Sequence, residues 1–274
     1  MATPSIDIGV IGGSGFYRYL ADMEPVEVST PYGPPSAPPQ VGTLGGISLG
    51  FIPRHGTGHT YPPHRVPYRA NMWALHSLGA TRVFGPSAGG SLRTDIQPGH
   101  IVVCDQLINR THGRGDTFHD GPEVAHLAFA DPYCPELRAA VISAGETWAD
   151  QADGVESDLH PRGTVVVVEG PRFSTRAESS WHRSMGAEVV TMTQYPEPAL
   201  ARELGMCYSG LCLVTDYDTG LEGDVSSTAV TARSVLETLD QVVNRAQELI
   251  AGAIDSLGSS RSCKCSSAPE QARL

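Results

Sequence analysis

Short apolar runs alternate along this chain with longer segments in which apolar residues recur at helical spacing. Runs such as Val165–Val168 are apolar on both faces, which is typical of strands covered on both sides. The short runs predict strands at Asp7–Gly12, Ile47–Pro53, Arg82–Pro86, Ile101–Leu107, Thr164–Val168, Glu188–Met192 and Cys207–Thr215. The periodic segments predict helices at Tyr68–Leu78, Pro135–Ala149, Thr175–Ser184, Glu197–Leu204 and Thr228–Leu257.

The alternation of strands and helices predicts the α/β class, with helices on both sides of a central sheet. Leu78-Gly79 and Met185-Gly186 have the pattern of helix C-caps, which supports two of the predicted helix ends. No Ser/Gly-rich linker divides the chain, so residues 1–258 are expected to form one domain. The residues after Gly258 contain almost no apolar side chains, and this composition predicts a disordered tail over residues 259–274.

Acidic residues outnumber basic ones and give the 274-residue chain a formal net charge of −11. This charge disfavours nonspecific binding to nucleic acid or to an anionic membrane. No apolar run approaches the roughly 20 residues of a membrane span, and the N-terminus has no basic region followed by an apolar core. We therefore expect a cytoplasmic protein that binds neither nucleic acid nor membrane.

The cysteines do not show the spacing of a disulfide framework or of a zinc site. Most of them are scattered and are expected to be buried structural thiols: Cys104, Cys134, Cys207 and Cys212. The other two, Cys263 and Cys265, lie in the polar tail and have no assigned role. The sequence therefore predicts no metal site.

Two polar segments follow predicted strands and carry candidate chemistry: EGPRFSTRAES at Glu169–Ser179 and VTDYD at Val214–Asp218. In open α/β sheets, ligands bind at the carboxyl ends of the strands. The second segment presents Asp216 and Asp218 close together after a very apolar strand, which disfavours a solvated turn or a metal-binding pair. Burial and a neighbouring carboxylate can raise the pKa of one of them and keep its proton at neutral pH. An enzyme with a nitrogen base as leaving group needs such an acid.

Other strand ends have residues suited to anions. The Gly-rich turn at Ile8–Phe16 does not match the G-x-G-x-x-G dinucleotide motif, and it is either a plain tight turn or an anion nest that includes Ser14. Arg54 and His55 follow an apolar strand, where a guanidinium can bind phosphate in a bidentate way and an imidazole can donate. The GPSAGGSL segment offers the Ser87 hydroxyl and the Ala88 N–H.

A metal site at the histidines is disfavoured. His55 and His59 would be i, i+4 ligands on a helix, but Gly56 and Gly58 argue against a helix there. No acidic ligand lies nearby in the sequence. An anion site is the simpler interpretation of this segment.

Several motifs occur in the order, and at about the spacings, found in the trimeric nucleoside phosphorylases: GGSGF, PRHG, PSAGGS, EGPRFSTRAES, MTQYPE and TDYD. Over Ile6–Leu257 the chain resembles that family, and most of all its branch that cleaves S-methyl-5′-thioadenosine. The resemblance implies a single-domain nucleoside phosphorylase fold with a mixed sheet, and a homotrimer. It implies phosphorolysis of a purine nucleoside, a reaction of purine and methionine salvage, with phosphate as co-substrate and no metal or organic cofactor.

The same resemblance assigns site residues by position. The implied phosphate set is Ser14, Arg54, His55, Ser87, Ala88 and Thr193. Met192 would lie against the sugar and Phe173 against the base, while His126 would reach the 5′ end of the sugar from a neighbouring subunit. Asp216 and Asp218 would face the purine N7 and its 6-substituent. The 5′ pocket is expected near Ala232 and Val235 on the last helix, and the segment before this helix does not align well.

Asp216 is the expected general acid, because a proton near N7 stabilises the departing purine. It needs burial and the charge of Asp218 to stay protonated, since the reference pKa of aspartate is about 3.9. Relatives that cleave 6-oxopurine nucleosides have Glu and Asn where this chain has Ser174 and Asp216. A carboxylate accepts from a 6-amino group and a hydroxyl tolerates an unprotonated N1, so adenine nucleosides are favoured.

Three alternatives stay open. A purine nucleoside phosphorylase with broader adenosine or 6-oxopurine specificity would use the same residues, and the 5′ substituent is not fixed. A nucleotide-dependent oxidoreductase would share the Gly-rich first turn and would bind NAD. A scaffold would share the fold, but it would have no need for the hydroxyls and both aspartates.

Overall fold

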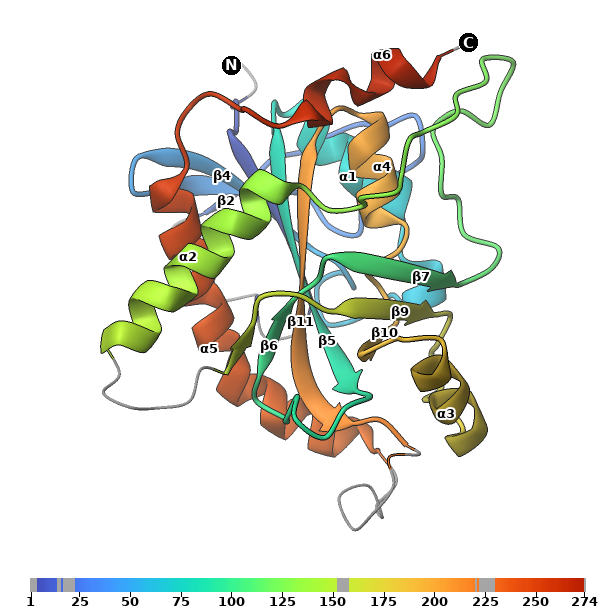
Figure 1. The fold of residues 1–274 in the computed structure, drawn as a ribbon. Helices are drawn as coiled ribbons and strands as arrows, with labels where there is room; N and C mark the ends of the chain where they lie inside the picture. Colours follow the sequence, from blue (N-terminus) through green and yellow to red (C-terminus); the bar gives the residue numbers. More distant parts are fainter. Residues whose placement is uncertain are drawn as a thin grey trace.

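A long parallel strand pair forms the centre of the computed structural model, which describes residues 4–13, 16, 23–151, 158–219, 221 and 230–273. Strand β11 (Cys207–Tyr217) runs beside β5 (Arg82–Ser91) along nearly its whole length (Figure 1). The first residues of β5 also pair with β1 (Ile8–Gly12), and its last residues pair antiparallel with β10 (Val189–Thr191). Because β5 changes neighbours partway, the ends of several strands meet around its second half.

The remaining strands extend an 11-stranded mixed sheet from this centre. They are β4 (Ile47–Pro53), β3 (Gln40–Leu44) and β2 (Glu24–Pro25) beyond β1, β9 (Thr164–Val168) and β7 (Gln106–Arg110) beyond β10, and β6 (Ile101–Val103) and β8 (Leu159–His160) beyond β11. Parallel pairs such as β1 with β4 coexist with antiparallel pairs such as β3 with β4. The predicted α/β class with a mixed sheet is confirmed.

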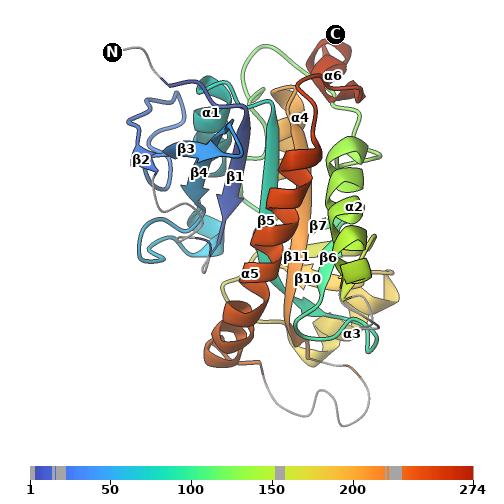
Figure 2. The same ribbon diagram turned by 90° about the vertical axis from the view of Figure 1, so that its left-hand side faces the viewer.

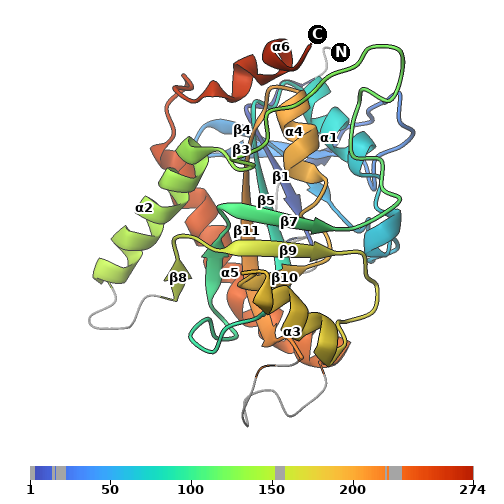
Figure 3. The same ribbon diagram turned by 45° about the vertical axis from the view of Figure 1, so that its right-hand side comes forward.

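Helices cover both faces of the sheet, as predicted (Figure 2). Helices α2 (Pro135–Gln151) and α5 (Ala232–Ser256) pack together and against β11, in a core that includes Leu211 and Leu213. Helices α1 (Tyr68–Ser77) and α4 (Glu197–Glu203) pack in a second core that includes Cys212 and Val214. Alternate residues of β11 thus serve opposite faces, which explains why this strand is apolar throughout. Helix α3 (Arg176–Ser184) lies beside β9 and β10 (Figure 3).

Local sequence signals account for several helix ends. Gly79 and Gly186, predicted as C-caps of α1 and α3, have φ angles of 104° and 85°, the left-handed region that favours glycine. Helix α3 begins with a capping box in which Thr175 Oγ1 accepts from the Glu178 N–H at 3.1 Å. The last helix begins at Ala232 rather than Thr228, which lies outside the described residues.

One predicted strand is wrong. Ile101–Leu107 is two strands, β6 and β7, and the chain turns between them at Cys104 and Asp105. The Cys104 N–H donates to the Gly210 carbonyl of β11, whereas the Asp105 N–H donates to the Gly163 carbonyl just before β9. The chain therefore leaves one part of the sheet and joins another within two residues, a change that an apolar run does not reveal.

The segment after Gly258 is packed against the domain, which corrects the prediction of a disordered tail. It forms the short helices η4 (Lys264–Ser267) and α6 (Ala268–Ala272), and Cys265 and Ala272 are buried. Much of the anchoring uses backbone groups: Arg261 Nη1 donates to the Gly205 carbonyl at 2.8 Å, and Glu136 Oε2 accepts from the Ser262 N–H at 2.8 Å. Composition does not indicate such contacts, because they need few apolar side chains.

The cysteine prediction also needs correction. Cys134 and Cys207 are buried as predicted, but they are not scattered: they meet the two cysteines of the tail. The four sulfur atoms of Cys134, Cys207, Cys263 and Cys265 lie within 4.8 Å of one another. The other two cysteines, Cys104 and Cys212, are buried as predicted.

The long segment Asn109–Asp131 has little regular structure beyond the end of β7, in agreement with its lack of periodicity. It is tied to the tail, because the His126 N–H donates to the Ala272 carbonyl at 2.8 Å and Ala125 forms an isolated bridge with Arg273. In the part of the chain that the structure describes, no helix is long and apolar enough to cross a membrane.

Candidate functional site

A cavity of about 600 Å³ lies where the ends of the central strands meet. Ten of the residues predicted from the sequence line it: Arg54, His55, Ser87, Ala88, Phe173, Ser174, Met192, Thr193, Asp216 and Asp218. Two other predicted site residues are not among the residues that line the cavity. Ser14 lies outside the described residues, although its neighbour Gly13 lines the cavity. His126 is exposed and is not among the lining residues.

One end of the cavity is built around a buried arginine. Arg54 follows β4 directly, and its side chain is 1% exposed. Its Nε and Nη2 donate to the two carboxylate oxygens of Glu197 at 2.6 and 2.9 Å. Nη2 also donates to the Ile11 carbonyl at 2.9 Å, and Nη1 donates to the Pro86 carbonyl at 2.8 Å. Four of the five guanidinium N–H groups are therefore used within the chain.

This geometry corrects the predicted bidentate contact between Arg54 and phosphate. The bidentate partner is Glu197, and one N–H of Nη1 remains for a ligand. Burial lowers the pKa of Arg54, but the carboxylate of Glu197 more than offsets it and keeps this pKa above its ordinary value. The group stays charged, and most of its charge is already paired.

Glu197 is a functional residue that the sequence analysis missed. It is 1% exposed, lies at the start of α4, and also accepts from the Tyr208 hydroxyl at 2.6 Å. Gly85 of β5 leaves room for the Tyr208 side chain, because a Cβ added there would overlap the Tyr208 hydroxyl. Only its place within the MTQYPE motif marks Glu197 in the sequence, since Arg54 is far away along the chain.

His55 lies beside this pair and has a defined tautomer. Its Nδ1 is 2.8 Å from the Tyr61 carbonyl oxygen, which can only accept, so Nδ1 carries the proton. Burial lowers the pKa of His55 to about 4, so the ring is neutral at pH 7. Nε2 then presents a lone pair, and the predicted imidazole donor is instead an acceptor. The ring also stacks on His59, with centroids 4.2 Å apart.

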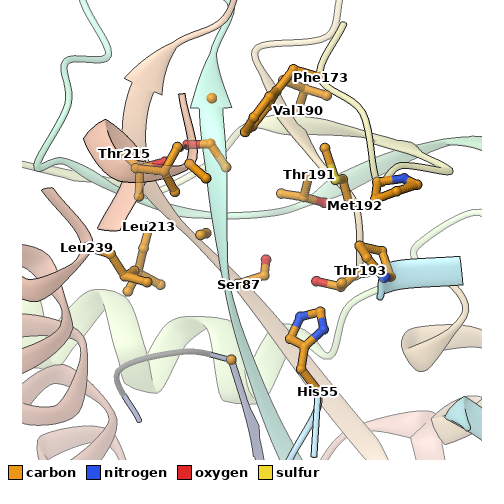
Figure 4. A pocket seen from close by; sticks show the side chains of 18 of the residues that line it. His55, Ser87, Phe173, Val190, Thr191, Met192, Thr193, Leu213, Thr215 and Leu239 are labelled. Carbon is orange, nitrogen blue, oxygen red and sulfur yellow. Dashed lines mark hydrogen bonds between the residues drawn. The ribbon is translucent and has the colours of Figure 1, made fainter. Parts of the chain in front are cut away.

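Two hydroxyls complete this end of the cavity. Figure 4 shows the Ser87 and Thr193 side chains above the His55 ring, with the Thr193 hydroxyl on the side nearer Ser87. Ser87 Oγ accepts from Gln194 Nε2 at 3.2 Å and donates to the Leu211 carbonyl at a long 3.4 Å. That weak second bond leaves the hydroxyl proton easily redirected to an anion.

The opposite end of the cavity holds the two aspartates. Val214 of β11 faces Gly89 of β5, but Asp216 faces Gly90, so Thr215 is the extra residue of a β-bulge. A bulge re-aims side chains next to a site. Gly90 makes this possible, because a Cβ there would lie 2.9 Å from Asp216 Oδ1 and 3.2 Å from the Asp218 Cβ.

The two carboxyl groups differ in their surroundings. Burial raises the pKa of Asp216 to about 6; the Thr215 hydroxyl, which donates to Oδ2 at 2.7 Å, opposes the rise, and the charge of Asp218 adds to it. Burial also raises the pKa of Asp218, while hydrogen bonds from the Ser179 and Ser174 hydroxyls lower it. Among the described residues, Asp218 Oδ2 has no hydrogen-bond partner. This oxygen is therefore a buried acceptor without a partner in the described part of the chain.

Between the two ends, the wall is apolar. Figure 4 places Met192 between His55 and Phe173, with Val190 beside Phe173. The start of α5 contributes a further apolar surface that lies near the predicted 5′ pocket: Ala232, Val235, Leu236 and Leu239. Leu236 is 51% exposed and Phe173 is 37% exposed, so this part of the cavity is open at one side.

The chain matches known proteins over nearly its whole length. A family described as the phosphorylase superfamily matches residues 7–255. The S-methyl-5′-thioadenosine phosphorylase of Mycolicibacterium smegmatis is 51% identical over 257 residues, which cover 93% of this chain and 93% of the relative. The purine nucleoside phosphorylase of Streptomyces coelicolor is 48% identical over 274 residues, covering 96% and 94%.

A solved structure has the same fold. The methylthioadenosine phosphorylase from Schistosoma mansoni in complex with adenine aligns with a TM-score of 0.90 and 34% sequence identity. The alignment covers 98% of this chain and 99% of that one.

Proposed function

Because the chain belongs to the phosphorylase superfamily, we propose that it is a pentosyltransferase that cleaves purine nucleosides with inorganic phosphate. The proposed main substrate is S-methyl-5′-thioadenosine, and the products are adenine and 5-methylthioribose-1-phosphate. The names of the relatives from M. smegmatis and S. mansoni support this choice. We also propose a cytoplasmic location, where phosphate and nucleoside are both present.

The observation that carries the proposal is the order of groups along one cavity. Asp216 faces Gly90 of β5, three residues along that strand from Ser87, so the two carboxyl groups lie apart from the proposed anion-binding groups Arg54, His55 and Ser87 in the same cavity. Val190 faces Gly90 and Thr191 faces Gly89 of the same strand, so Met192, the next residue, lies between the two sets of groups along β5. Phosphorolysis needs this order, because phosphate must attack the sugar carbon from the side opposite the departing base.

Charge develops at both ends during the reaction. Cleavage of the C1′–N9 bond leaves positive charge on the sugar and negative charge on the purine. We propose that bound monohydrogen phosphate stabilises the sugar cation and then attacks it. Its P–OH proton fits the lone pair of His55 Nε2, and its oxygens fit the free Arg54 N–H together with the hydroxyls of Ser87 and Thr193. The Ala88 N–H and Ser14 complete the proposed phosphate set.

Asp216 is the proposed acid for the purine. With a pKa of about 6 it is mostly ionised in the free enzyme at pH 7, with about one molecule in ten protonated. A bound purine removes remaining water and favours the neutral form further. Asp216 then shares a proton with N7, as general acid catalysis requires.

Base selectivity follows from the neighbouring carboxylate. Asp218 Oδ2 has no partner in the described part of the chain and can accept from a 6-amino group. A 6-oxo group placed there would bring two acceptors together and cost about 1–3 kcal/mol. Ser174, which donates to Asp218, offers no carboxylate to an N1–H. Adenine is therefore the proposed base, with Phe173 against its ring.

The apolar start of α5 supports a methylthio group at the 5′ position. Val235, Leu236 and Leu239 offer no polar partner to a 5′ hydroxyl, whereas a thioether needs none. The alternative is a purine nucleoside phosphorylase with broader specificity, which the name of the S. coelicolor relative favours.

A phosphate-dependent release assay tests the proposal. Free base is measured with S-methyl-5′-thioadenosine, adenosine and inosine, with and without phosphate and with EDTA. We expect the highest kcat/KM for the first substrate, no turnover without phosphate, and no effect of EDTA. A preference for inosine would support the broader alternative, and phosphate-independent release would contradict phosphorolysis.

We further propose a homotrimer in which His126 reaches the sugar pocket of the neighbouring subunit. Support comes from its exposure on a long irregular segment that is held against the tail by the Ala272 carbonyl. The exposed apolar side chain of Val124 lies on the same segment. Light scattering should give the mass of a trimer, and an active monomer would contradict this proposal.

A further inference from the structure

The main cluster of reactive side chains outside the cavity is formed by cysteines at the opposite end of β11. Cys207 opens this strand, whose other end carries Asp216. Cys134 directly precedes α2, and Cys263 and Cys265 flank Lys264 at the start of η4. All four sulfur atoms lie within 4.8 Å of one another, and those of Cys207 and Cys263 are 3.3 Å apart.

We propose that these four cysteines bind one zinc ion in a closed tetrahedral site. A Zn–S bond of about 2.3 Å places the sulfurs of a tetrahedral site about 3.8 Å apart, inside the range of this cluster. Four sulfur ligands without a histidine or carboxylate select a soft thiophilic cation. Because the protein fills all four positions, the site is structural and leaves no position for substrate.

The surrounding contacts hold the ligands in place without help from a metal. Glu136 Oε2 accepts from the Cys263 N–H at 3.1 Å and from the Ser262 N–H at 2.8 Å, which fixes the tail against the start of α2. The Leu137 N–H, in the first turn of α2, donates to the Cys134 sulfur. In metalloproteins, hydrogen bonds of this kind to the ligand residues orient the ligands around the metal.

Charge and access also fit a metal thiolate. Four thiolates around Zn²⁺ leave two negative charges, and Arg261 Nη1 lies 3.9 Å from the Cys207 sulfur. Arg261 is held there by the carbonyls of Thr81 and Gly205, at 3.2 and 2.8 Å. Cys134, Cys207 and Cys265 are buried, whereas Cys263 is partly exposed and provides a way in for the ion.

Such a zinc site would hold the C-terminal segment against the rest of the domain. The ion would connect the start of α2 and the start of β11 with the segment that leads into α6. Helix α6 in turn contacts α4, whose first residue is Glu197, and holds the segment that carries His126. The same four sulfurs could instead form disulfide bonds, which would tie the same segments without a metal, and the experiment distinguishes these two chemistries.

The test uses the full chain, expressed in zinc-supplemented medium and purified with a mild reductant and no chelator. Inductively coupled plasma mass spectrometry should find about one zinc per chain. The thiols of the cluster should become reactive to a thiol reagent only as zinc is released, which a colorimetric zinc indicator detects in parallel. Stripped protein reloaded with Co²⁺ should show the absorption bands of a tetrahedral cobalt thiolate.

Variants locate the metal. The double variant Cys263→Ser/Cys265→Ser should lose most of the zinc, and its melting temperature should no longer depend on zinc. Cys212→Ala is the matched control, because Cys212 is buried but lies outside the cluster, and this variant should keep its zinc. The wild-type cobalt spectrum does not depend on whether either variant folds.

Two outcomes would overturn the proposal. One is reduced, folded wild-type protein that contains no metal and in which the cluster thiols react freely. The other is metal-free protein whose mass is lower by four hydrogens, which indicates two disulfides. Either result would leave the proposed phosphorolysis untouched, because that activity is measured separately and uses the other end of β11.

Discussion

The two ends of the cavity handle buried charge in opposite ways. At the proposed phosphate end, three polar groups already have partners within the chain: Arg54 binds Glu197, His55 donates to the Tyr61 carbonyl, and Ser87 contacts Gln194. The ligand therefore meets groups with fixed positions and fixed charges, and little reorganisation is needed when it binds.

At the aspartate end, polar groups are buried without full compensation. Asp216 and Asp218 both have raised pKa values, and Asp218 Oδ2 has no partner among the described residues. In the proposed reaction, the purine base supplies the missing partners. One end therefore holds its groups in fixed positions, whereas the other has two carboxyl groups that are only partly compensated within the chain.

The largest expected effect comes from replacing the proposed acid. Asp216→Asn removes the transferable proton but retains the shape of the side chain. Turnover of S-methyl-5′-thioadenosine should fall about 10²–10⁴-fold, the usual contribution of a general acid. Inosine turnover should fall less, because an amide can donate to N7 and to a 6-oxo group. The measurement is kcat/KM on both substrates, and an equal proportional loss would mean that Asp216 does not read the base.

The stability of the same variant separates chemistry from folding. Burial raises the pKa of Asp216 from 3.8 to about 6, so its protonated form is favoured in the folded state. The stability that this group contributes is full below pH 3.8 and is lost as the pH rises through 6. Above pH 6 the ionised group costs up to about 3 kcal/mol, a cost that asparagine does not have. At pH 8 the variant should melt no lower than wild type, and a clearly lower melting temperature would indicate a structural role.

The next largest effect concerns the paired end. Glu197→Ala leaves the Arg54 guanidinium buried without its carboxylate, which should reduce the free energy of unfolding by about 3–5 kcal/mol. Tyr208→Phe is the matched control: it removes one hydrogen bond to the same carboxylate and should cost about 1.5–3 kcal/mol. Chemical denaturation measures both. Equal, small losses would show that the pair is not needed to hold this end together.

The smallest effect is a shift in pH dependence. The Thr215 hydroxyl donates to Asp216 and lowers its pKa, so Thr215→Val should raise that pKa by about one unit. Because the protonated form is the proposed acid, activity falls as pH rises through this pKa. The basic limb of the kcat/KM profile should therefore move to higher pH.

Thr191→Val is the control for this shift. Thr191 also lines the cavity, but its hydroxyl has no hydrogen-bond partner in the described part of the chain. The basic limb of the kcat/KM profile of Thr191→Val should stay at the same pH as in wild type. A basic limb that does not move in Thr215→Val either would mean that another group sets it.

The sequence predicted the groups that follow strand ends, because such positions depend on local pattern. Arg54 directly follows β4 and Asp216 lies near the end of β11, whereas Ser87 lies within β5, which extends beyond its predicted end at Pro86. The structure brings all three to one cavity. Their individual contacts could not be predicted in this way. The partner of Arg54 is Glu197, 143 residues away, and the bulge at Thr215 depends on how β11 is registered against β5.

The tail shows a second limit of sequence patterns. A polar composition predicts disorder when stability must come from apolar side chains. Here the residues after Gly258 are held by Arg261, by backbone donors to Glu136 and by the meeting of Cys263 and Cys265 with cysteines from two other elements. Contacts of this kind depend on distant parts of the chain and have no local signature.

Gly85 has a consequence for how this enzyme tolerates variation. It touches no proposed ligand and does not line the cavity, yet any side chain there would displace the Tyr208 hydroxyl and, through it, the carboxylate that fixes Arg54. A library that samples every substitution at every position should therefore find Gly85 as intolerant as the residues that contact substrate. Judged by such a tolerance map alone, a space-giving glycine would be mistaken for part of the active site.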